Sequence, residues 1–321
     1  MIVELPNTTT SAVSRALVRI REEGGAVALG RVLTLIICTE LGAEEDAIEA
    51  ANHASREHPM RVIVLSKSAD PTHPVEASLD AEIRVGGDAG ASEVIVLRAY
   101  GEAAKSEESL VNGLLLADAP VVAWWPGDAP VVVAESPIGR MAQRRITDAA
   151  AQSDPRGYLQ HLARSYTPGD TDFAWTRLTL WRAQLAAVLD QPPFEPVTRV
   201  HIEGAWDSPS TTLLAAWLQL QLGAKADTIL DDPVGSKPGI HRVRLQRASG
   251  DIVLERVPGN IVTLVQPGQP NHDISLPRRD LPECLAEELR RLDPDDLFGE
   301  VLQVGLGKLS EPDTSSITLP T

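Results

Sequence analysis

A strand, a turn and a helix start rich in hydroxyl groups form the clearest candidate for binding chemistry in this sequence. Residues 200–212 read Val-His-Ile-Glu-Gly-Ala-Trp-Asp-Ser-Pro-Ser-Thr-Thr. Hydroxyls and backbone amides at a helix start can hold an anion such as a sugar phosphate, because the helix dipole favours negative charge there. We therefore take Ser208, Ser210 and Thr211 as a candidate anion site. Ser and Asp at a helix start also serve as ordinary caps, and that simpler interpretation stays open.

A second candidate is a segment that mixes tryptophan with arginine. Residues 173–182 read Phe-Ala-Trp-Thr-Arg-Leu-Thr-Leu-Trp-Arg, and helical spacing gives two stripes that each combine aromatics with arginine. Trp and Arg are the residue types that dominate hot spots between proteins. The alternative is a helix that packs domains together, with arginines reaching solvent. The candidate partner contacts here are Trp175, Arg177, Trp181 and Arg182. Arg140, Arg144 and Arg145 add a basic cluster in an acidic chain.

The third candidate is the end of a short apolar strand at residues 119–128, which read Ala-Pro-Val-Val-Ala-Trp-Trp-Pro-Gly-Asp. Because successive strand side chains alternate, Trp124 and Trp125 are expected to point to opposite sides. Pro126 and Gly127 then end the strand. Such a strand end is typical of a binding edge in an open α/β sheet. The alternative is that both tryptophans fill the core. If one is exposed, we expect it to contact a protein rather than a substrate.

Motifs of catalysis and cofactor binding are missing from the sequence. There is no P-loop, no G-x-G-x-x-G between a strand and a helix, no G-x-S-x-G and no H-E-x-x-H. Residues 86–90 are glycine-rich but are expected to form a turn between two strands. His53 and His58 are five apart, which is the wrong spacing for a metal pair on one helical face. The sequence therefore predicts no catalytic residue, no metal site and no cofactor.

Composition narrows the classes of partner. Across 321 residues, Lys plus Arg is 29 and Asp plus Glu is 45, which gives a net charge of 29 − 45 = −16. A field of that sign repels nucleic acid and anionic lipid, so neither is expected as a partner. The two cysteines, Cys38 and Cys284, make no disulfide framework, which favours a reducing compartment. No apolar stretch approaches the roughly 20 residues of a membrane span. We expect a cytoplasmic protein.

Continuous apolar runs predict the strands of the first half. Strands are expected at 31–39, 60–67, 81–85, 93–100 and in the Trp124–Trp125 stretch. Helices are expected after the capping residues 8–10, at 43–57 and from 106 or 107 to 116. Shorter helices are expected at 139–145 and 158–165. Apolar strands that alternate with helices indicate a mainly parallel sheet covered by helices. The predicted fold class is α/β, with an N-terminal α/β domain at residues 1–166.

The pattern changes in the second half. A long helix is expected at 172–190, a strand at 197–202 and a helix from the Ser208 cap to about residue 222, closed by Gly223. Alternating runs at 240–246, 252–257, 261–266 and 272–276 predict an antiparallel meander. Helices at 281–292 and from 294 to about 302 complete an α+β C-terminal domain at residues 167–309. Residues 310–321 are expected to form a disordered tail.

Three separated blocks resemble a known family. They are residues 117–126, residues 172–182 and the ending that runs from Asp280-Leu-Pro-Glu through Leu292-Asp-Pro-Asp-Asp-Leu-Phe-Gly-Glu. In order and spacing they are similar to the actinobacterial members of OpcA, the glucose-6-phosphate dehydrogenase assembly protein. The likeness extends from the first helix to about residue 302.

The resemblance implies a protein that is not itself an enzyme and that promotes assembly or activation of glucose-6-phosphate dehydrogenase. That enzyme is the NADP-reducing entry step of the oxidative pentose phosphate pathway. Cyanobacterial relatives link activation to the redox state of cysteines. Neither Cys38 nor Cys284 matches a regulatory pair, so the resemblance does not carry redox control to this chain. It also carries over no catalytic residue, in agreement with the lack of catalytic motifs in the sequence.

Three hypotheses follow from the sequence. The first is a non-catalytic assembly factor or allosteric activator of glucose-6-phosphate dehydrogenase, with Trp124 and Trp125 joining the contacts named above. The second is a sugar-phosphate-binding module or enzyme of the same pathway, using the helix start at residues 207–212. The third is a structural scaffold without effect on rate.

Overall fold

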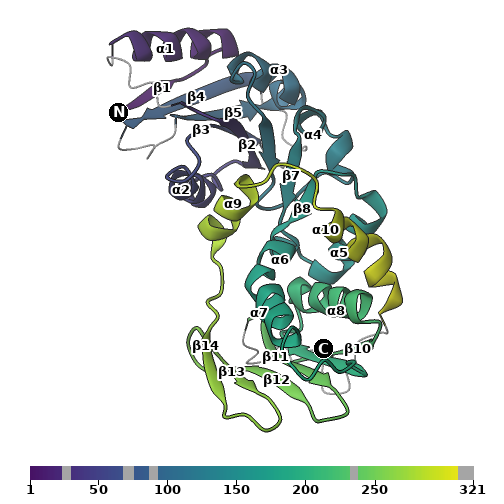
Figure 1. Cartoon of the computed structure of the whole chain (residues 1–321). Coiled ribbons are helices and arrows are strands. Elements are labelled where there is room, and N and C mark those ends of the chain that lie inside the picture. Colours follow the sequence, from purple (N-terminus) through teal and green to yellow (C-terminus); the bar gives the residue numbers. More distant parts are fainter. Residues whose placement is uncertain (24–29, 68–75, 87–92, 232–237, 310–321) are drawn as a thin grey trace. The chain divides into compact units, whose positions relative to one another are not determined.

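The computed structural model describes residues 1–23, 30–67, 76–86, 93–231 and 238–309, and it divides into two compact units (Figure 1). The first unit comprises Met1–Thr147, Gly169–Thr171 and Asp280–Pro294, and the second comprises Asp148–Pro168, Asp172–Arg279 and Asp295–Thr321. The domain boundary predicted at residue 166 stays a prediction. The predicted disordered tail and most of the predicted glycine-rich turn lie outside the described residues.

An eight-stranded sheet forms the centre of the first unit, in the order β1-β4-β5-β3-β2-β6-β7-β8. The strands are β1 (Ile2–Leu5), β2 (Leu33–Glu40), β3 (Met60–Lys67), β4 (Ser78–Val85), β5 (Glu93–Tyr100), β6 (Val121–Trp124), β7 (Arg144–Thr147) and β8 (Asp170–Asp172). Strands β5, β3, β2, β6 and β7 run parallel, and β4 runs antiparallel to both β5 and β1. The mainly parallel sheet predicted from the apolar runs is therefore confirmed.

The strand order reverses next to β2. The chain passes from β2 to β3 and β5 on one side and then returns to β6 and β7 on the other. In open α/β sheets, ligands bind beyond the carboxyl ends of the strands at such a switch point. The stretch that contains Trp124 and Trp125 ends at this edge, because β6 lies directly beside β2.

Helices cover this sheet because each has an apolar stripe. They are α1 (Thr10–Glu23), α2 (Glu45–Ala54), α3 (Glu107–Val111), α4 (Pro137–Met141) and α9 (Leu281–Leu289). Val13 and Leu17 of α1 pack with alternate residues of the sheet, including Ile36, Ile63 and Ile95, in one apolar cluster. Helix α9 packs against α2.

Strand β7 corrects two expectations. The helix predicted at 139–145 ends at Met141 in α4, and Arg144 and Arg145 instead lie on β7. They form no exposed basic cluster, because both are buried and paired. Arg144 donates to Glu288 of α9 at 2.5 Å and to the Asp293 carbonyl at 2.8 Å, and Arg145 donates to Asp170 at 2.5 Å. Arg144 and Arg145, which the sequence suggested as part of a basic cluster, instead hold α9 and β8 in place at β7.

The second unit contains a six-stranded sheet in the order β10-β9-β11-β12-β13-β14. The strands are β9 (Arg199–Gly204), β10 (Lys225–Leu230), β11 (Ile240–Gln246), β12 (Ile252–Arg256), β13 (Ile261–Val265) and β14 (His272–Ser275). Strands β11 to β14 form the predicted antiparallel meander. Strand β10 was not expected; it pairs in parallel with β9.

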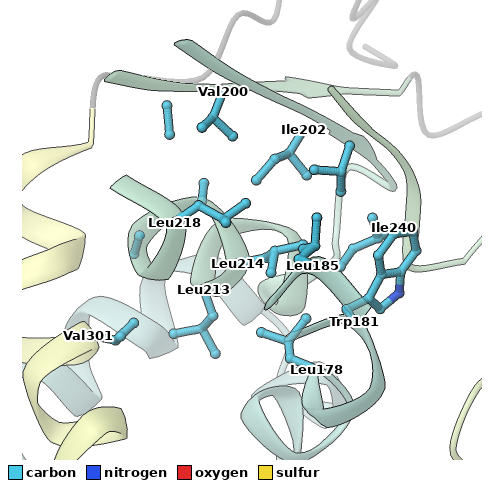
Figure 2. Packing of buried hydrophobic residues seen from close by; sticks show 14 of the residues in the cluster. Leu178, Trp181, Leu185, Val200, Ile202, Leu213, Leu214, Leu218, Ile240 and Val301 are labelled. Carbon is cyan, nitrogen blue, oxygen red and sulfur yellow. The ribbon is translucent and has the colours of Figure 1, made fainter. Parts of the chain in front are cut away.

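The helices of the second unit contribute apolar side chains to one core with this sheet, and α8 lies against β9 and β10 (Figure 2). They are α5 (Pro155–Ser165), α6 (Phe173–Thr176), α7 (Thr179–Leu189), α8 (Pro209–Leu222) and α10 (Asp296–Glu300), the last followed by a π turn at Val301–Gly305. Leu213, Leu214 and Leu218 of α8 belong to the same apolar cluster as Val200 and Ile202 of β9. As predicted, α8 begins after Ser208 and ends at Gly223, whose φ of 65° is left-handed.

The single long helix predicted at 172–190 is wrong. The structure has two helices, α6 and α7, with a break at Arg177 and Leu178. Leu178 donates its amide to the Trp175 carbonyl, three residues back, and the Thr179 hydroxyl donates to the Thr176 carbonyl at 2.8 Å. A hydroxyl that bonds the backbone competes with the continuing helix, which explains the break.

Candidate functional site

Both tryptophans at the end of β6 are buried. Trp124 is 0% exposed and Trp125 is 4% exposed. Trp125 packs in the same apolar cluster as Ile36 and Ala123, and its amide donates to the Ile146 carbonyl at 3.0 Å. Trp124 is not part of that cluster, as expected from the alternation of strand side chains. A buried indole offers a partner no surface, so the contact role predicted for these two residues has no support from the geometry.

Trp175 and Trp181 are also buried, in the apolar core of the second unit. The indole of Trp175 donates to Asp295 at 2.8 Å, and the guanidinium of the half-buried Arg182 lies 3.7 Å from the centre of its ring. Cation–π stacking of this kind holds the arginine against the indole. Three of the four contacts predicted in this segment thus take part in the internal packing of the unit.

Arg177 is half-buried as well, with 27% of its side chain exposed. It forms a bidentate ion pair with Asp148, in which both nitrogen–oxygen distances are 2.7 Å. A bidentate guanidinium–carboxylate pair fixes the geometry as well as the charge. Of the six predicted contact residues, the two arginines keep some surface and the four tryptophans do not.

A cavity of roughly 750 Å³ lies at the switch-point edge of the first unit. Its lining combines the end of β2, the start of α2 and the turn that follows Trp125. The charged lining residues are Glu40, Asp46, Lys67, Glu107 and Asp128, and the neutral ones include Cys38, Trp125, Pro126 and Gly127. Lys67 forms an ion pair with Glu107. The predicted rim after Trp124 thus does border a cavity, with Trp125 in its wall.

The residues at this edge do not fit a dinucleotide. A dinucleotide-binding sheet places a glycine-rich turn after its first strand, so that pyrophosphate sits at the next helix start. Here residues 41–43 read Leu-Gly-Ala, and the helix start that follows carries Glu44, Glu45 and Asp46. This segment therefore lacks the glycine-rich turn of a dinucleotide-binding sheet, and acidic side chains occupy the helix start where pyrophosphate would lie.

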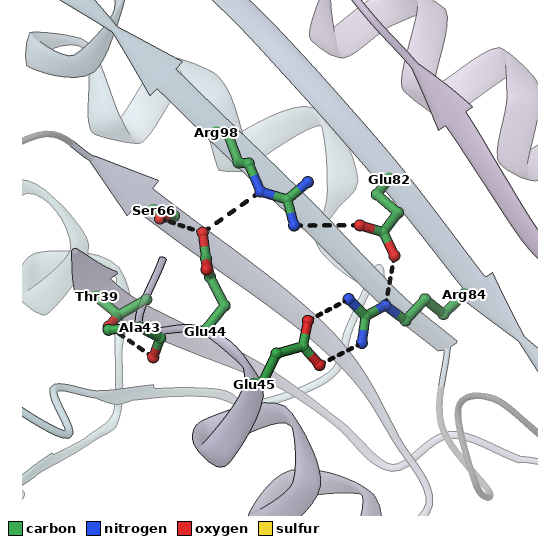
Figure 3. A network of polar contacts seen from close by, with 8 residues as sticks. All are labelled: Thr39, Ala43, Glu44, Glu45, Ser66, Glu82, Arg84 and Arg98. Carbon is green, nitrogen blue, oxygen red and sulfur yellow. Dashed lines mark hydrogen bonds and ion pairs between the residues drawn. The ribbon is translucent and has the colours of Figure 1, made fainter. Parts of the chain in front are cut away.

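Two of these carboxylates, Glu44 and Glu45, belong to the polar network of Figure 3. Glu44 accepts from the Ser66 hydroxyl at 2.7 Å and lies 3.4 Å from Arg98. Arg84 donates to Glu45 at 2.6 and 2.9 Å, and so ties the start of α2 to β4. The edge that binds ligands in other doubly wound sheets here carries an ion-pair network.

The network makes the stability of the first unit sensitive to acid. Burial alone would raise the pKa of Glu44, but the hydrogen bond from Ser66, backbone amides and Arg98 outweigh it and lower that pKa below 4.5. The hydrogen bond from Arg84 lowers the pKa of Glu45 in the same way. A lowered folded-state pKa gives stability that is present above pH 4.5 and is lost as the pH falls through the lowered values.

We therefore expect the Glu45→Gln variant to show a shallower loss of stability on acidification than the natural chain. The measurement is the urea midpoint of unfolding between about pH 6 and about pH 3, the window in which such carboxylates titrate. Glu108→Gln, at an exposed position of α3, is the control and should keep the natural slope. Parallel curves for Glu45→Gln and the natural chain would contradict the assignment.

Cys38 lines the same cavity but is not poised to react. Burial, and then the charge of Glu107, raise the pKa of its thiol well above the ordinary value. Since the thiolate is the reactive form, this thiol is inert at neutral pH. Cys284 is likewise buried.

Of the three hydroxyls predicted as an anion site, those of Ser208 and Ser210 are hydrogen-bonded inside the second unit, and that of Thr211 is buried with no hydrogen-bond partner among the described residues. Ser208 accepts from the Thr211 amide at 3.3 Å as the cap of α8, and Ser210 donates to the Ala174 carbonyl at 2.8 Å. The Thr211 hydroxyl is buried against Gly204, where an added Cβ would overlap it. The simpler interpretation of these hydroxyls as caps is therefore correct for Ser208, and direct anion binding by the three stays a prediction.

Ser208 and Ser210 nevertheless border a second cavity, of roughly 340 Å³. Its other lining residues come from several stretches, among them the α6–α7 break, α7, the turn before α8, the start of β11, the end of β12 and the segment after β14. They include Arg177, Trp181, Asp207, Arg256, Arg278 and Arg279. No sequence pattern singled out Arg256 or Arg278, because they approach α8 only through the meander. Among the residues that the structure describes, no group of His, Cys, Asp and Glu has the arrangement of a metal site.

Fold and site define a protein of two α/β units whose switch-point edge carries carboxylates in place of a nucleotide-binding loop. Two family models match the chain. One describes the N-terminal domain of a glucose-6-phosphate dehydrogenase subunit and matches residues 51–164; the other describes the C-terminal domain of that subunit and matches residues 168–302. The chain belongs to this family, OpcA, as the sequence resemblance indicated.

Several solved structures are similar over most of their length. A putative oxidoreductase from Magnetospirillum magnetotacticum MS-1 is 14% identical and covers 87% of this chain and 99% of its own, with a TM-score of 0.43. The glucose-6-phosphate 1-dehydrogenase of Mycobacterium avium is 13% identical, with 88% and 93% covered and a TM-score of 0.40. No curated protein matches at a significant level. No helix within the described ranges has the length and hydrophobicity to cross a membrane.

Proposed function

We propose that this chain is a non-catalytic assembly factor or allosteric activator of glucose-6-phosphate dehydrogenase, acting in the cytoplasm in support of the oxidative pentose phosphate pathway. The observation that carries the proposal is the family match, which spans residues 51–164 and 168–302 and names both halves as domains of a glucose-6-phosphate dehydrogenase subunit. The partner in this proposal is the dehydrogenase itself.

A non-catalytic role is supported by the residues at the switch-point edge. Glu44, Glu45 and Asp46 occupy the helix start where a dehydrogenase of this topology would bind its dinucleotide. Glu44 and Glu45 are held by ion pairs, so a structural network lies where a cofactor loop would be needed. A chain built in this way contributes binding surface rather than hydride-transfer chemistry.

Activation by such a chain requires unequal affinity for two states of the enzyme. A partner shifts a conformational or assembly equilibrium only by as much as it prefers one state. A coupling of roughly 1–3 kcal/mol would change the apparent substrate affinity of the enzyme about 5- to 150-fold. No residue of this chain has to enter the active site of the enzyme for that effect.

Exposed residues of the second unit are the best candidates for contact. Of the six residues predicted from sequence, Arg177 and Arg182 keep partly exposed surface, and Arg182 is already stacked on an indole. Trp206, in the turn between β9 and α8, is 42% exposed and was not among those six. Trp and Arg are the residue types enriched in hot spots. We assign Trp206 and Arg177 as contacts with the dehydrogenase.

The test mixes purified chain with its cognate glucose-6-phosphate dehydrogenase and follows both co-elution and NADPH formation against substrate concentration. We expect a stable complex and a lower apparent KM or a higher kcat. Unchanged kinetics without co-elution would refute the proposal. Co-elution with an unchanged rate of NADPH formation would support the hypothesis of a structural scaffold. Turnover of substrate by the chain alone would support the hypothesis that it is an enzyme.

In the same assay, Trp206→Ala is expected to weaken the complex about tenfold, the loss of one hot-spot residue. Because Trp206 is partly exposed, thermal unfolding of the free chain should change little. Phe194→Ala, at an aromatic that is 76% exposed elsewhere in this unit, is the matched control. Weakening by Phe194→Ala alone would move the contact surface away from Trp206.

A further inference from the structure

The cavity beside α8 gathers positive charge in an acidic chain. It measures roughly 340 Å³ and is bordered by the arginines Arg177, Arg256, Arg278 and Arg279. Three separate stretches of the second unit supply them: the α6–α7 break, the end of β12 and the segment that follows β14. The volume lies at the lower end of the range for small-molecule sites. The net charge of the whole chain is −16, so this local excess of cations is not a by-product of composition.

Two of these arginines are not neutralised. Arg256 donates to the Leu276 carbonyl at 2.8 Å, and Arg278 donates to the Pro238 carbonyl at 3.0 Å. Carbonyls orient a guanidinium without cancelling its charge. Within the described part of the chain, neither Arg256 nor Arg278 makes an ion pair. Arg177, by contrast, is already compensated by Asp148.

The two guanidiniums also repel each other. Burial, and then the charge of Arg278, lower the pKa of Arg256 to about 10. At neutral pH Arg256 is still charged, so the cost of holding two partly desolvated cations together persists. An anion placed between them would remove that cost, because opposite charge favours the ionised form of both.

Nearby carboxylates do not supply that anion. Arg256 and Arg278 also border an adjoining cavity with Glu203, Asp231 and Glu255. Those acids lie closest to other residues: Arg242 is 2.7 Å from Glu255 and 3.3 Å from Glu203, and His241 is 2.9 Å from Asp231. Asp207 lines the arginine cavity too, but its side chain is exposed at the edge.

The remaining walls suit a small phosphate ester. The first turn of α8, with Ser208 and Ser210, presents the positive end of a helix dipole. Leu178, Trp181 and Ile240 supply an apolar side, and the Arg256 guanidinium lies 5.5 Å from the centre of the Trp181 ring. The doubly charged phosphate group of such an ester matches the polar wall of the cavity, and the uncharged remainder of the ester matches the apolar wall.

We propose that this cavity binds a small phosphate monoester, with the phosphate group held by Arg256 and Arg278 beside the start of α8. Two guanidiniums can each donate a pair of hydrogen bonds to a phosphate, which a single lysine cannot do. The site lies wholly within the second unit and does not require a bound enzyme. This unit would therefore bind the phosphate ester whether or not the chain activates glucose-6-phosphate dehydrogenase.

The test is calorimetric titration of the full chain with inorganic phosphate and, separately, with glucose 6-phosphate at low ionic strength. We expect both to bind, with the ester the tighter of the two. Arg256→Gln combined with Arg278→Gln should weaken binding at least about tenfold. Arg199→Gln removes the same charge from an arginine that is 48% exposed and outside the cavity, so it should bind as the natural chain does.

Stability measurements separate a binding role from a structural one. Because Arg256 and Arg278 repel each other, Arg256→Gln should unfold at a temperature no lower than the natural chain. Arg256→Lys keeps the positive charge but loses the planar guanidinium that can donate two parallel hydrogen bonds, so this variant should bind phosphate more weakly. Equal loss of binding in Arg199→Gln, or no heat from either ligand with the natural chain, overturns the site. Equal affinity for phosphate and the ester overturns the ester assignment.

Discussion

Replacing Glu93 by Ala is expected to cost the first unit about 3–5 kcal/mol of its unfolding free energy, the range for removing one partner of a buried ion pair. Glu93 is 1% exposed at the start of β5. Its carboxylate accepts from Arg61 at 2.8 and 3.0 Å and from Arg21 at 2.9 Å, and Arg31 lies 3.7 Å away. One buried carboxylate therefore serves as the shared ion-pair partner of three arginines.

Most of the lost stability arises at Arg61, because its buried side chain cannot reorient towards solvent when Glu93 is removed. Its side chain is 6% exposed, whereas that of Arg21 is 43% exposed. Arg61 also donates to the Leu114 carbonyl at 2.5 Å, a contact that fixes the segment after α3. Without Glu93 a charged guanidinium would stay buried with no counter-charge, and β3, β5 and that segment would loosen together.

The measurement is native-state hydrogen exchange of β3 and β5 amides, which reports this unit separately from the other. Glu102→Ala is the control, since Glu102 pairs with Lys105 at 2.6 Å in an exposed position, and it should change nothing measurable. Combining Arg61→Met with Glu93→Ala should recover part of the loss. If Glu93→Ala proves as mild as the control, the buried cluster does not have the role described.

The sequence predicts the central strands of the first unit because those strands carry their own signal. Strands β2, β3 and β5 are apolar on both faces, and burial on both faces is what a parallel strand requires. Strand β7 carries no such signal, since it reads Arg-Arg-Ile-Thr. Its burial depends on Glu288, which is 144 residues away along the chain, and no local pattern can reveal that partner.

The second unit shows the same limit. Strand β10, Lys225–Leu230, reads as a polar segment, and its pairing with β9 depends on α8 as the crossover between them. For the candidate sites, alternation places Trp124 and Trp125 on opposite faces but cannot say what covers each face. Arg256 and Arg278 meet only because the meander returns the chain to α8, so the residues of the arginine cavity become visible only in three dimensions.

Replacing Trp175 by Ala is expected to destabilise the second unit by about 3–5 kcal/mol, the usual cost of removing a buried tryptophan side chain. Trp175 is 1% exposed. Its ring lies 5.6 Å from that of Phe298, and its indole nitrogen donates to Asp295 at 2.8 Å. Asp295 in turn caps α10 by accepting from the Phe298 amide at 3.0 Å. The substitution would therefore leave a cavity and loosen the attachment of α10.

Trp175→Phe separates the packing of this residue from a contact with a partner. It keeps most of the buried apolar volume and removes the indole hydrogen bond, for which a loss of about 1 kcal/mol is expected. Both variants would be followed by hydrogen exchange of α8 and α10 amides and by affinity for glucose-6-phosphate dehydrogenase. If Trp175 acts through packing, Trp175→Phe should bind the enzyme as tightly as the natural chain. A large loss of affinity in Trp175→Phe with nearly natural stability would show that this indole meets the partner directly, as its sequence context suggested.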